Sequence, residues 1–220
     1  MGMGVDARNR MAKRAAEEIQ DGMVVNLGIG IPSLVPNFLP KERNVVFHAE
    51  NGILGMGPSP VRGMEDANLC NAGGFPVTLN KGGSYCDSAI SFAMIRRGKI
   101  DLTILGSLQV SQNGDLANWI VPGRKIPGMG GAIDLGQKAK RVAVVMRQCD
   151  RQGRPKIVES CTLPLTAKGC VNRIITEMAV FEVTAKGLWL IELFEPYGVK
   201  DVVEQTDCKV HVSGSLRRIY

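Results

Sequence analysis

The chain has 220 residues, of which 45% are hydrophobic and 22% are charged. A chain of this length buries roughly 70% of its unfolded surface, so its core needs no disulfide or metal. The composition excludes a disordered chain, a coiled coil and a fibrous repeat. No apolar run approaches the ~20 residues of a membrane span, and the charged N-terminal segment is unlike a signal peptide. We therefore expect a cytoplasmic protein that binds no membrane.

The charge balance favours an anionic ligand. Lysine and arginine exceed aspartate and glutamate by 27 to 21, a net charge of +6. This excess suits nucleic acid or a phosphorylated small molecule, or it is simply a solvated basic surface. Aromatic residues make up only 5% and no run of five basic residues occurs, so we expect no nucleic acid partner. Six cysteines without CxxC spacing and only two histidines predict no metal site.

Helices and short apolar strands alternate in the first half of the chain. Capping residues predict helices over 6–20, 32–40 and 87–97. Residues 55–85 and 119–134 are rich in glycine and proline and are expected to form long excursions. Short strands are expected over 23–27, 45–48, 77–79 and 102–105.

The second half continues this alternation. Helices are expected over 168–176 and 199–206, and a strand pair is expected around Lys186 and Gly187. The strands are expected over 142–146, 157–158, 180–183, 188–193 and 210–212. Unbroken apolar strands between helices predict an α/β fold whose mostly parallel sheet is covered on both faces. No repeat or linker interrupts the chain, so we expect a single domain over 1–220.

The loops that follow the strands are the expected place for a ligand, because open α/β sheets bind ligands beyond the carboxyl ends of their strands. One such loop lies within FHAENGILG at 47–55, where Glu50 ends a strand. Asn51 and Gly52 follow it and tolerate a tight turn, which would expose the Glu50 carboxylate. That carboxylate is either a functional group or a solvated residue of the turn.

Two glycine-rich segments are further candidates. The segment 26–30 resembles the start of a dinucleotide-binding loop, but Ser33 replaces the third glycine, which favours a close strand-to-helix turn. The backbone N–H groups of 128–131 can form an oxyanion hole, or the glycines let a loop cross a packed surface. His48 shares a strand face with Glu50 and is either a base or a packed core histidine.

Several segments, taken in order, resemble one protein family. The segment 47–55 resembles the glutamate signature of the B (beta) subunit of the two-subunit 3-oxoacid coenzyme A transferases, of the succinyl-CoA:3-ketoacid and acetate/acetoacetate type. The other similar segments are NLGIGIP at 26–32, GDLANW at 114–119, PGMGGAIDL at 127–135, CTLPLT at 161–166, CVNRIIT at 170–176 and AVFEVT at 179–184. The likeness implies a three-layer α/β/α CoA-transferase-like fold.

The resemblance also implies a mechanism. Glu50 would attack the thioester of an acyl-CoA in a ping-pong reaction, with a glutamyl-CoA thioester as the intermediate. Coenzyme A (CoA) is then a substrate, and no cofactor is implied. A carboxylate is a weak nucleophile, so positioning and oxyanion stabilisation must lower the barrier. The N–H groups of Gly130 and Gly131 would hold the oxyanion. The implied substrate-binding loops contain Asn26, Gly28, Gly30, Asn51 and Gly52.

The same resemblance implies a partner. The alpha (A-type) CoA-transferase subunit would complete the site in an αβ or α2β2 assembly, so this chain should carry half a site and an exposed apolar face. Arg124, Lys125 and Lys138 lie near the glycine cluster and are candidates for contacts with the CoA phosphates. His48 stands where glutamine is more usual in the family. Such departures leave the identity of the two carboxylic acids that exchange CoA undetermined.

Two other functions are considered. A sugar-phosphate isomerase or sensor domain would share the layered fold, but the turn after Glu50 argues against it. A non-catalytic CoA-binding partner would need neither Glu50 nor the glycine cluster, and both are intact.

Overall fold

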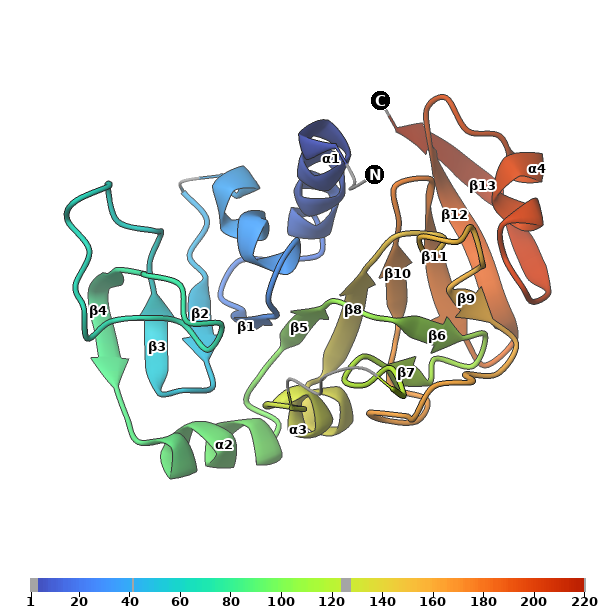
Figure 1. Cartoon of the computed structure of the whole chain (residues 1–220). Helices are drawn as coiled ribbons and strands as arrows, with labels where there is room; N and C mark the ends of the chain where they lie inside the picture. The colour runs from blue at the N-terminus through green and yellow to red at the C-terminus, as the bar shows by residue number, and fades with distance from the viewer. Residues whose placement is uncertain (1–3, 41, 124–127, 220) are drawn as a thin grey trace.

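The computed structural model describes residues 4–40, 42–123 and 128–219. A ten-stranded sheet runs through its centre in the order β13-β12-β11-β10-β8-β5-β1-β2-β3-β4 (Figure 1). The strands of this sheet are β1 (Val24–Leu27), β2 (Val46–Ala49), β3 (Ile53–Met56), β4 (Leu79–Tyr85), β5 (Leu102–Leu105), β8 (Arg141–Val145), β10 (Arg173–Ile175), β11 (Ala179–Thr184), β12 (Gly187–Phe194) and β13 (Val210–Ile219).

A second sheet and the helices surround the first. The small sheet has the order β7-β6-β9, with bounds β6 (Gln109–Ser111), β7 (Leu116–Ala117) and β9 (Ile157–Val158). The helices are α1 (Val5–Ala16), the 3₁₀ helix η1 (Pro32–Phe38), α2 (Ser88–Arg96), α3 (Ala132–Lys138) and α4 (Val199–Glu204). Within the described ranges, no helix has the length and apolar character of a membrane span.

The centre of the large sheet is parallel. Strands β10, β8, β5, β1 and β2 run in the same direction. Antiparallel pairs extend the sheet at both flanks, through β3 and β4 on one side and β11 and β12 on the other. Strand β13 then lies parallel to β12. The carboxyl ends of β1, β2 and β5 therefore meet at one edge of the sheet.

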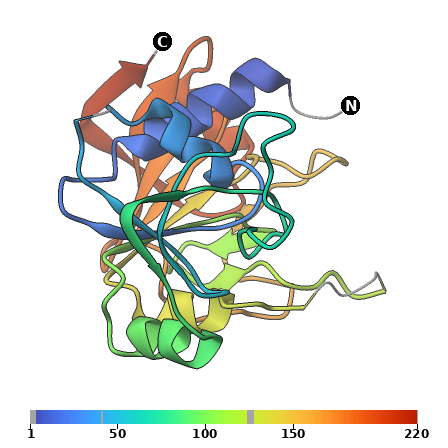
Figure 2. The same cartoon turned by 90° about the vertical axis from the view of Figure 1, so that its left-hand side faces the viewer.

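Successive residues of the central strands enter two separate cores, one on each face. On β5, Ile104 packs in the core that contains α1, whereas Leu105 packs in the core that contains α2 and α3. Val142 and Ala143 of β8 divide in the same way. Figures 1 and 2 show α1 and α2 on opposite sides of the molecule. The predicted α/β/α layers with a mostly parallel sheet are confirmed, because the central strands are buried on both faces.

Local signals explain two of the helices. The Asp87 carboxylate accepts a hydrogen bond from the Ile90 N–H at 2.8 Å, which caps α2 as its sequence predicts. The segment predicted as a helix over 32–40 forms a short 3₁₀ helix instead. Pro32 suits the first position of any helix, but Pro36 lies inside the segment and removes a backbone donor that an α-helix would use.

Other elements differ from the sequence-based expectations. The predicted helix over 168–176 was wrong, because residues 173–175 form β10 between β8 and β11. Ile174 and Ile175 each fill one of the two cores, which an extended strand permits. Within the predicted excursions lie the end of β3, all of β4 and the first three residues of α3. Those elements are short and glycine-containing, so they have weak local signals.

A buried cluster of charges joins α1 to the sheet. Arg14 is 5% exposed, and its guanidinium donates to Glu192 of β12 and, at 2.9 Å, to Glu18. Arg141 and Arg173 contact the same Glu18 carboxylate at 3.1 and 3.3 Å. Buried charges persist only when they are paired. Several basic residues of this chain are therefore paired within the fold and contribute less to binding an anionic ligand than the net charge suggests.

The two-core arrangement predicts a contrast between two isoleucines. Ile174→Ala removes a fully buried side chain of β10 and should lower the free energy of unfolding by ~2–5 kcal/mol. Ile90→Ala, at a position of α2 that is 53% exposed, should change it by less than about 0.5 kcal/mol. Urea unfolding of both variants measures the difference. Equal losses would contradict the placement of Ile174 in the core.

Candidate active site

A row of polar side chains crosses three neighbouring parallel strands. Thr103 of β5, Asn26 of β1 and His48 of β2 are paired in register, and each is at most 1% exposed. Residues next to them, such as Val25 and Phe47, face the core of α1. The row therefore points to the opposite face, which α2 and α3 cover. The Thr103 hydroxyl donates to Asn26 Oδ1 at 3.3 Å.

The Glu50 carboxylate lies directly beyond this row. Glu50 follows the last residue of β2 and is half-buried. Asn26 Nδ2 donates to Glu50 Oε2 at 3.0 Å. The same amide nitrogen lies 3.2 Å from the His48 carbonyl oxygen and 3.3 Å from His48 Nδ1. The Asn26 side chain thus fixes one oxygen of Glu50 relative to the sheet.

The turn after Glu50 requires glycine. Gly52 has a φ of +116°, and its N–H donates to the Ala49 carbonyl at 3.0 Å. A Cβ at Gly52 would lie 2.1 Å from the Cys86 carbonyl oxygen, which is far inside van der Waals contact. Only a residue without a side chain permits this turn. The turn reverses the chain into β3 and leaves the Glu50 side chain accessible.

Gly131 lies against Glu50 from the other side. A Cβ at Gly131 would approach Glu50 Cγ, Cδ and Oε1 to between 3.2 and 3.4 Å. Its φ of −78° suits any residue, so contact with Glu50 is the reason for glycine here. The neighbouring Gly130 has a φ of +52°, and a Cβ there would face open space. The glycine cluster therefore lies beside the carboxylate, as the sequence suggests.

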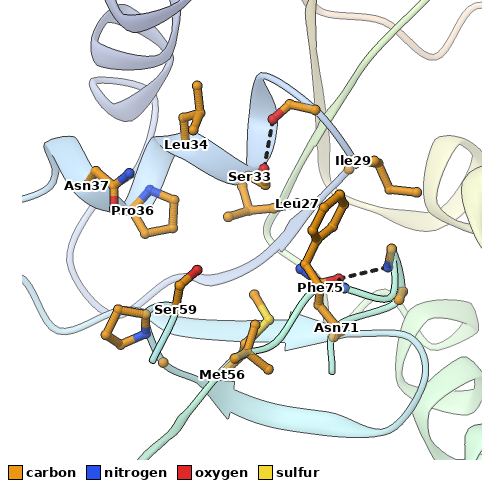
Figure 3. A pocket seen from close by; sticks show the side chains of 18 of the residues that line it. Leu27, Ile29, Ser33, Leu34, Pro36, Asn37, Met56, Ser59, Asn71 and Phe75 are labelled. Carbon is orange, nitrogen blue, oxygen red and sulfur yellow. Dashed lines mark hydrogen bonds between the residues drawn. The ribbon is translucent and has the colours of Figure 1, made fainter. Parts of the chain in front are cut away.

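Two cavities meet at Glu50, with volumes of about 310 and 440 Å³. Glu50, Gly28, Ile29 and Ala72 line both. The smaller cavity lies between η1 and residues 57–77, and Figure 3 shows its largely apolar lining. Side chains labelled there include Leu27, Ile29, Leu34, Pro36, Met56 and Phe75. The larger cavity is bounded by the glycines at 128–131 and by residues 105–108.

The wall of the larger cavity is held by two hydrogen-bonded side chains that sequence reasoning did not single out. Asn118 Nδ2 donates to the Gly106 carbonyl at 3.1 Å, and Asn118 Oδ1 accepts from the Thr166 hydroxyl at 2.7 Å. Lys156 Nζ donates to the Ser107 carbonyl at 2.7 Å. Burial lowers the pKa of Lys156 to about 8. Both side chains act on the backbone that follows β5.

The structure brings together most of the residues predicted for the site. Asn26, Gly28 and Gly30 lie with Glu50, Gly130 and Gly131 around the two cavities. Gly28 approaches the Ile104 carbonyl of β5, where a Cβ would lie 3.2 Å away.

The remaining predicted residues lie elsewhere. Asn51 is exposed, and its Nδ2 donates to the Cys70 carbonyl at 2.7 Å, so it joins the turn to the excursion. Gly52 is buried within the turn, and neither residue belongs to the described lining of these two cavities. Lys138 ends α3 and is exposed outside both linings. Arg124 and Lys125 lie outside the described residues.

Comparison with known proteins identifies the family. The family model described as coenzyme A transferase matches residues 8–205. The chain belongs to the coenzyme A transferase family. A probable coenzyme A transferase subunit beta of Bacillus subtilis is 61% identical over 212 residues, which cover 96% of this chain and 98% of that protein. The resemblance found in the sequence is thereby confirmed, and the chain is a subunit of a coenzyme A transferase.

A longer relative and a solved structure agree with this assignment. The human mitochondrial succinyl-CoA:3-ketoacid coenzyme A transferase 2 is 54% identical over 214 residues. The aligned region covers 96% of this chain but only 41% of that longer protein. The acyl-CoA transferase YdiF of Escherichia coli O157:H7 superposes with a TM-score of 0.78 at 21% identity. That match covers 100% of this chain and 44% of YdiF. At such low identity, the superposition establishes the fold.

The contact between Gly131 and Glu50 can be tested by adding one methyl group. Gly131→Ala should displace the carboxylate and lower kcat by about tenfold to a hundredfold, because small misplacements of a reacting group are costly. Gly214→Ala is the matched control, since its Cβ meets open space in β13. Steady-state kinetics and thermal unfolding are measured for both. Full activity in folded Gly131→Ala would contradict the predicted contact.

Proposed function

We propose that this chain is the catalytic B-type subunit of an enzyme that moves CoA between a short-chain acyl-CoA and a 3-oxo carboxylic acid. The reaction would pass through a thioester between CoA and Glu50. One observation supports this most strongly: the Glu50 carboxylate lies where two cavities meet and is held by Asn26 at 3.0 Å.

The proposed reaction balances without any redox step. A Glu50 oxygen attacks the thioester carbonyl, the C–S bond breaks, and CoA leaves as a thiolate. The thiolate then attacks the Glu50 carbonyl of the mixed anhydride, so that the original acid departs as a carboxylate. An acceptor carboxylate attacks the resulting glutamyl-CoA thioester, and the same steps run in reverse. Each nucleophile is already an anion, so no general base is needed.

The residues around Glu50 are suited to these steps. The Asn26 amide holds the nucleophile in place, and the same donor would stabilise the oxyanion when the Glu50 carbonyl is attacked. We assign the backbone N–H groups of Gly130 and Gly131 to the oxyanion of the substrate thioester. The close packing of Gly131 on Glu50 supports this assignment. The larger cavity beside these glycines would take the thioester end of CoA, and the smaller one the acyl group.

The smaller cavity contains one cation near its apolar lining. Arg8 of α1 and Glu50 are the charged residues among the described lining residues. A guanidinium at this position suits an acyl group that carries a second carboxylate. We therefore propose that one of the two acids is a dicarboxylic acid of the succinyl type.

Arg8 provides a test of this substrate preference. Arg8→Gln should raise KM for a dicarboxylic acyl-CoA such as succinyl-CoA by about tenfold, while KM for acetyl-CoA stays within about twofold. Lys13→Gln removes a charge from the same helix without touching the cavity and is the control. A loss that is equal for both acyl groups would count against the proposal.

We propose that the partner is an A-type CoA-transferase subunit, in an αβ or α2β2 assembly. The human relative is more than twice as long as this chain, which is consistent with two halves joined in one polypeptide. Large apolar side chains surround the smaller cavity and its 57–77 wall in exposed positions. They are Ile29 (64%), Val61 (77%), Met64 (76%) and Phe75 (57%). Clustered exposed apolar residues indicate an interaction surface.

The Glu50 assignment can be tested by covalent trapping. The assembled enzyme is incubated with acetoacetyl-CoA, digested and analysed by mass spectrometry. A CoA adduct on the peptide with Glu50 that hydroxylamine removes is expected for the native enzyme, and none for Glu50→Gln. Glu50→Asp should lose most activity, because the carboxylate retreats by one methylene. Glu204→Gln, an exposed glutamate of α4, is the control.

Other results would overturn this function. Substantial transfer by Glu50→Ala would exclude the glutamyl intermediate. Thermal stabilisation by a sugar phosphate but not by CoA would favour an isomerase or sensor domain of the same fold. CoA binding without an adduct from several acyl-CoA donors would favour a non-catalytic binding subunit.

A further inference from the structure

The His48 imidazole is a buried titratable group that the proposed reaction does not use. Its residue is 1% exposed, and both ring nitrogens have close polar neighbours. Nε2 lies 2.8 Å from the Ser91 hydroxyl of α2, and Nδ1 lies 3.3 Å from Asn26 Nδ2. The ring is therefore one step removed from Glu50 and touches it only through Asn26.

Counting hydrogens determines which nitrogen of the ring carries the proton. The Asn26 amide nitrogen has two hydrogens: one points to Glu50 Oε2, and the other is shared between the His48 carbonyl and His48 Nδ1. Nδ1 must then be the unprotonated acceptor. Nε2 carries the hydrogen and donates it to the Ser91 oxygen. The Ser91 hydroxyl in turn faces the Ala49 carbonyl at 3.4 Å.

The Glu50 carboxylate excludes the alternative orientation of the amide, whereas the Thr103 hydroxyl is compatible with either one. Thr103 places its hydroxyl 3.3 Å from Asn26 Oδ1 and donates to it. If the amide turned over, Asn26 Oδ1 would face the Glu50 carboxylate. Two hydrogen-bond acceptors would then meet with no hydrogen between them. The Asn26 side chain thus has neighbours that select one orientation, provided that His48 is neutral.

We infer that His48 is a positioning residue for the reaction proposed above. Its neutral ring holds the Asn26 amide in the orientation that donates to Glu50. This inference rests on the proposed role of Glu50 as the nucleophile. A protonated ring would present an N–H to the Asn26 NH₂ group, so donor would face donor and the amide would be pushed away from Glu50.

The surroundings of the ring keep it neutral at physiological pH. Burial lowers the pKa of His48 below its usual value, and the Glu50 carboxylate opposes this effect without reversing it. Among the described residues, Glu50 is the charged group acting on the ring. The contacts from β1 and α2 come from uncharged Asn26 and Ser91. A group with a lowered pKa is neutral above that pKa, so the positioning effect should be lost only as the pH falls.

Kinetics of the enzyme assembled with its A-type subunit test this inference. His48→Phe fills the space without an acceptor, and its kcat should fall by about tenfold or more while KM changes by less than about twofold. His48→Gln offers a carbonyl to Asn26 and an N–H to Ser91 without titrating. It should keep kcat within about threefold and lose the acid-side decline in kcat that we expect for the native enzyme at a pH below the ordinary histidine range. Its remaining decline should occur at the lower pH where carboxylates titrate.

His211 supplies the control, because the chain has only two histidines. It stacks on Trp189 at the β12–β13 pair, far along the sheet from β2. His211→Gln should keep the pH profile of the native enzyme. A native kcat in folded His48→Phe, or an unchanged acid decline in His48→Gln, would overturn the inference while leaving CoA transfer by Glu50 intact.

A spectroscopic measurement decides the geometry without relying on activity. Protein labelled with ¹⁵N-histidine should show His48 as the neutral Nε2–H tautomer at pH 7, with His211→Gln providing the assignment. A proton on Nδ1 would overturn the inference, even if the enzyme transferred no CoA.

Discussion

The register between β5, β1 and β2 is the constraint on which the site depends. It aligns Thr103, Asn26 and His48 in one buried row, and that row ends at the Glu50 carboxylate. A buried polar group without a partner costs ~1–3 kcal/mol, so each member of the row must be satisfied by the next. A shift of one residue in β1 would turn Asn26 toward the α1 core and remove the donor from Glu50. The fold and the orientation of the Glu50 carboxylate are thus maintained by the same contacts.

Glycine completes this arrangement from three directions, each for a different reason. Gly52 allows the reversal after β2, because a side chain there would collide with the Cys86 carbonyl. Gly28 lets the loop after β1 approach the end of β5, and Gly131 leaves room for the Glu50 side chain. Backbone therefore surrounds the carboxylate closely where side chains would displace it. In the proposed reaction, this close backbone packing would position the weakly nucleophilic carboxylate.

The two faces of the sheet have different tasks. On one face, buried ion pairs of Arg14 with Glu18 and Glu192 attach α1 to the sheet. The same helix places Arg8 in the lining of the smaller cavity. The face of α2 and α3 carries the polar row and brings Ser91 and Gly131 to it. Glu50 lies at the edge where both faces meet, which is why cavities open on either side of it. The exposed apolar residues around that edge are consistent with a site completed by a second subunit.

The sequence by itself determined the class of the fold and singled out most of the residues that the structure gathers around Glu50. Apolar strands between capped helices predicted the layered sheet, and the segment around Glu50 indicated the family that the comparisons confirm. The glycines were also recognisable, since tight turns and close backbone contacts leave few other choices. These features are local, and short stretches of sequence are enough to express them.

Only the tertiary structure decided how these residues act together. Residues 173–175 form a strand because their two adjacent isoleucines suit a strand that pairs with β8 and β11 and is buried on both faces. Thr103 and Ser91 carry no signal of function in sequence, and they matter through contacts with residues 77 and 43 positions away. Likewise, the contacts of His48 with Asn26 and Ser91 depend on the pairing of β1 with β2 and on the packing of α2. Hydrogen bonds between side chains depend on strand register and helix packing, which are set by the whole sheet and not by neighbours in the chain.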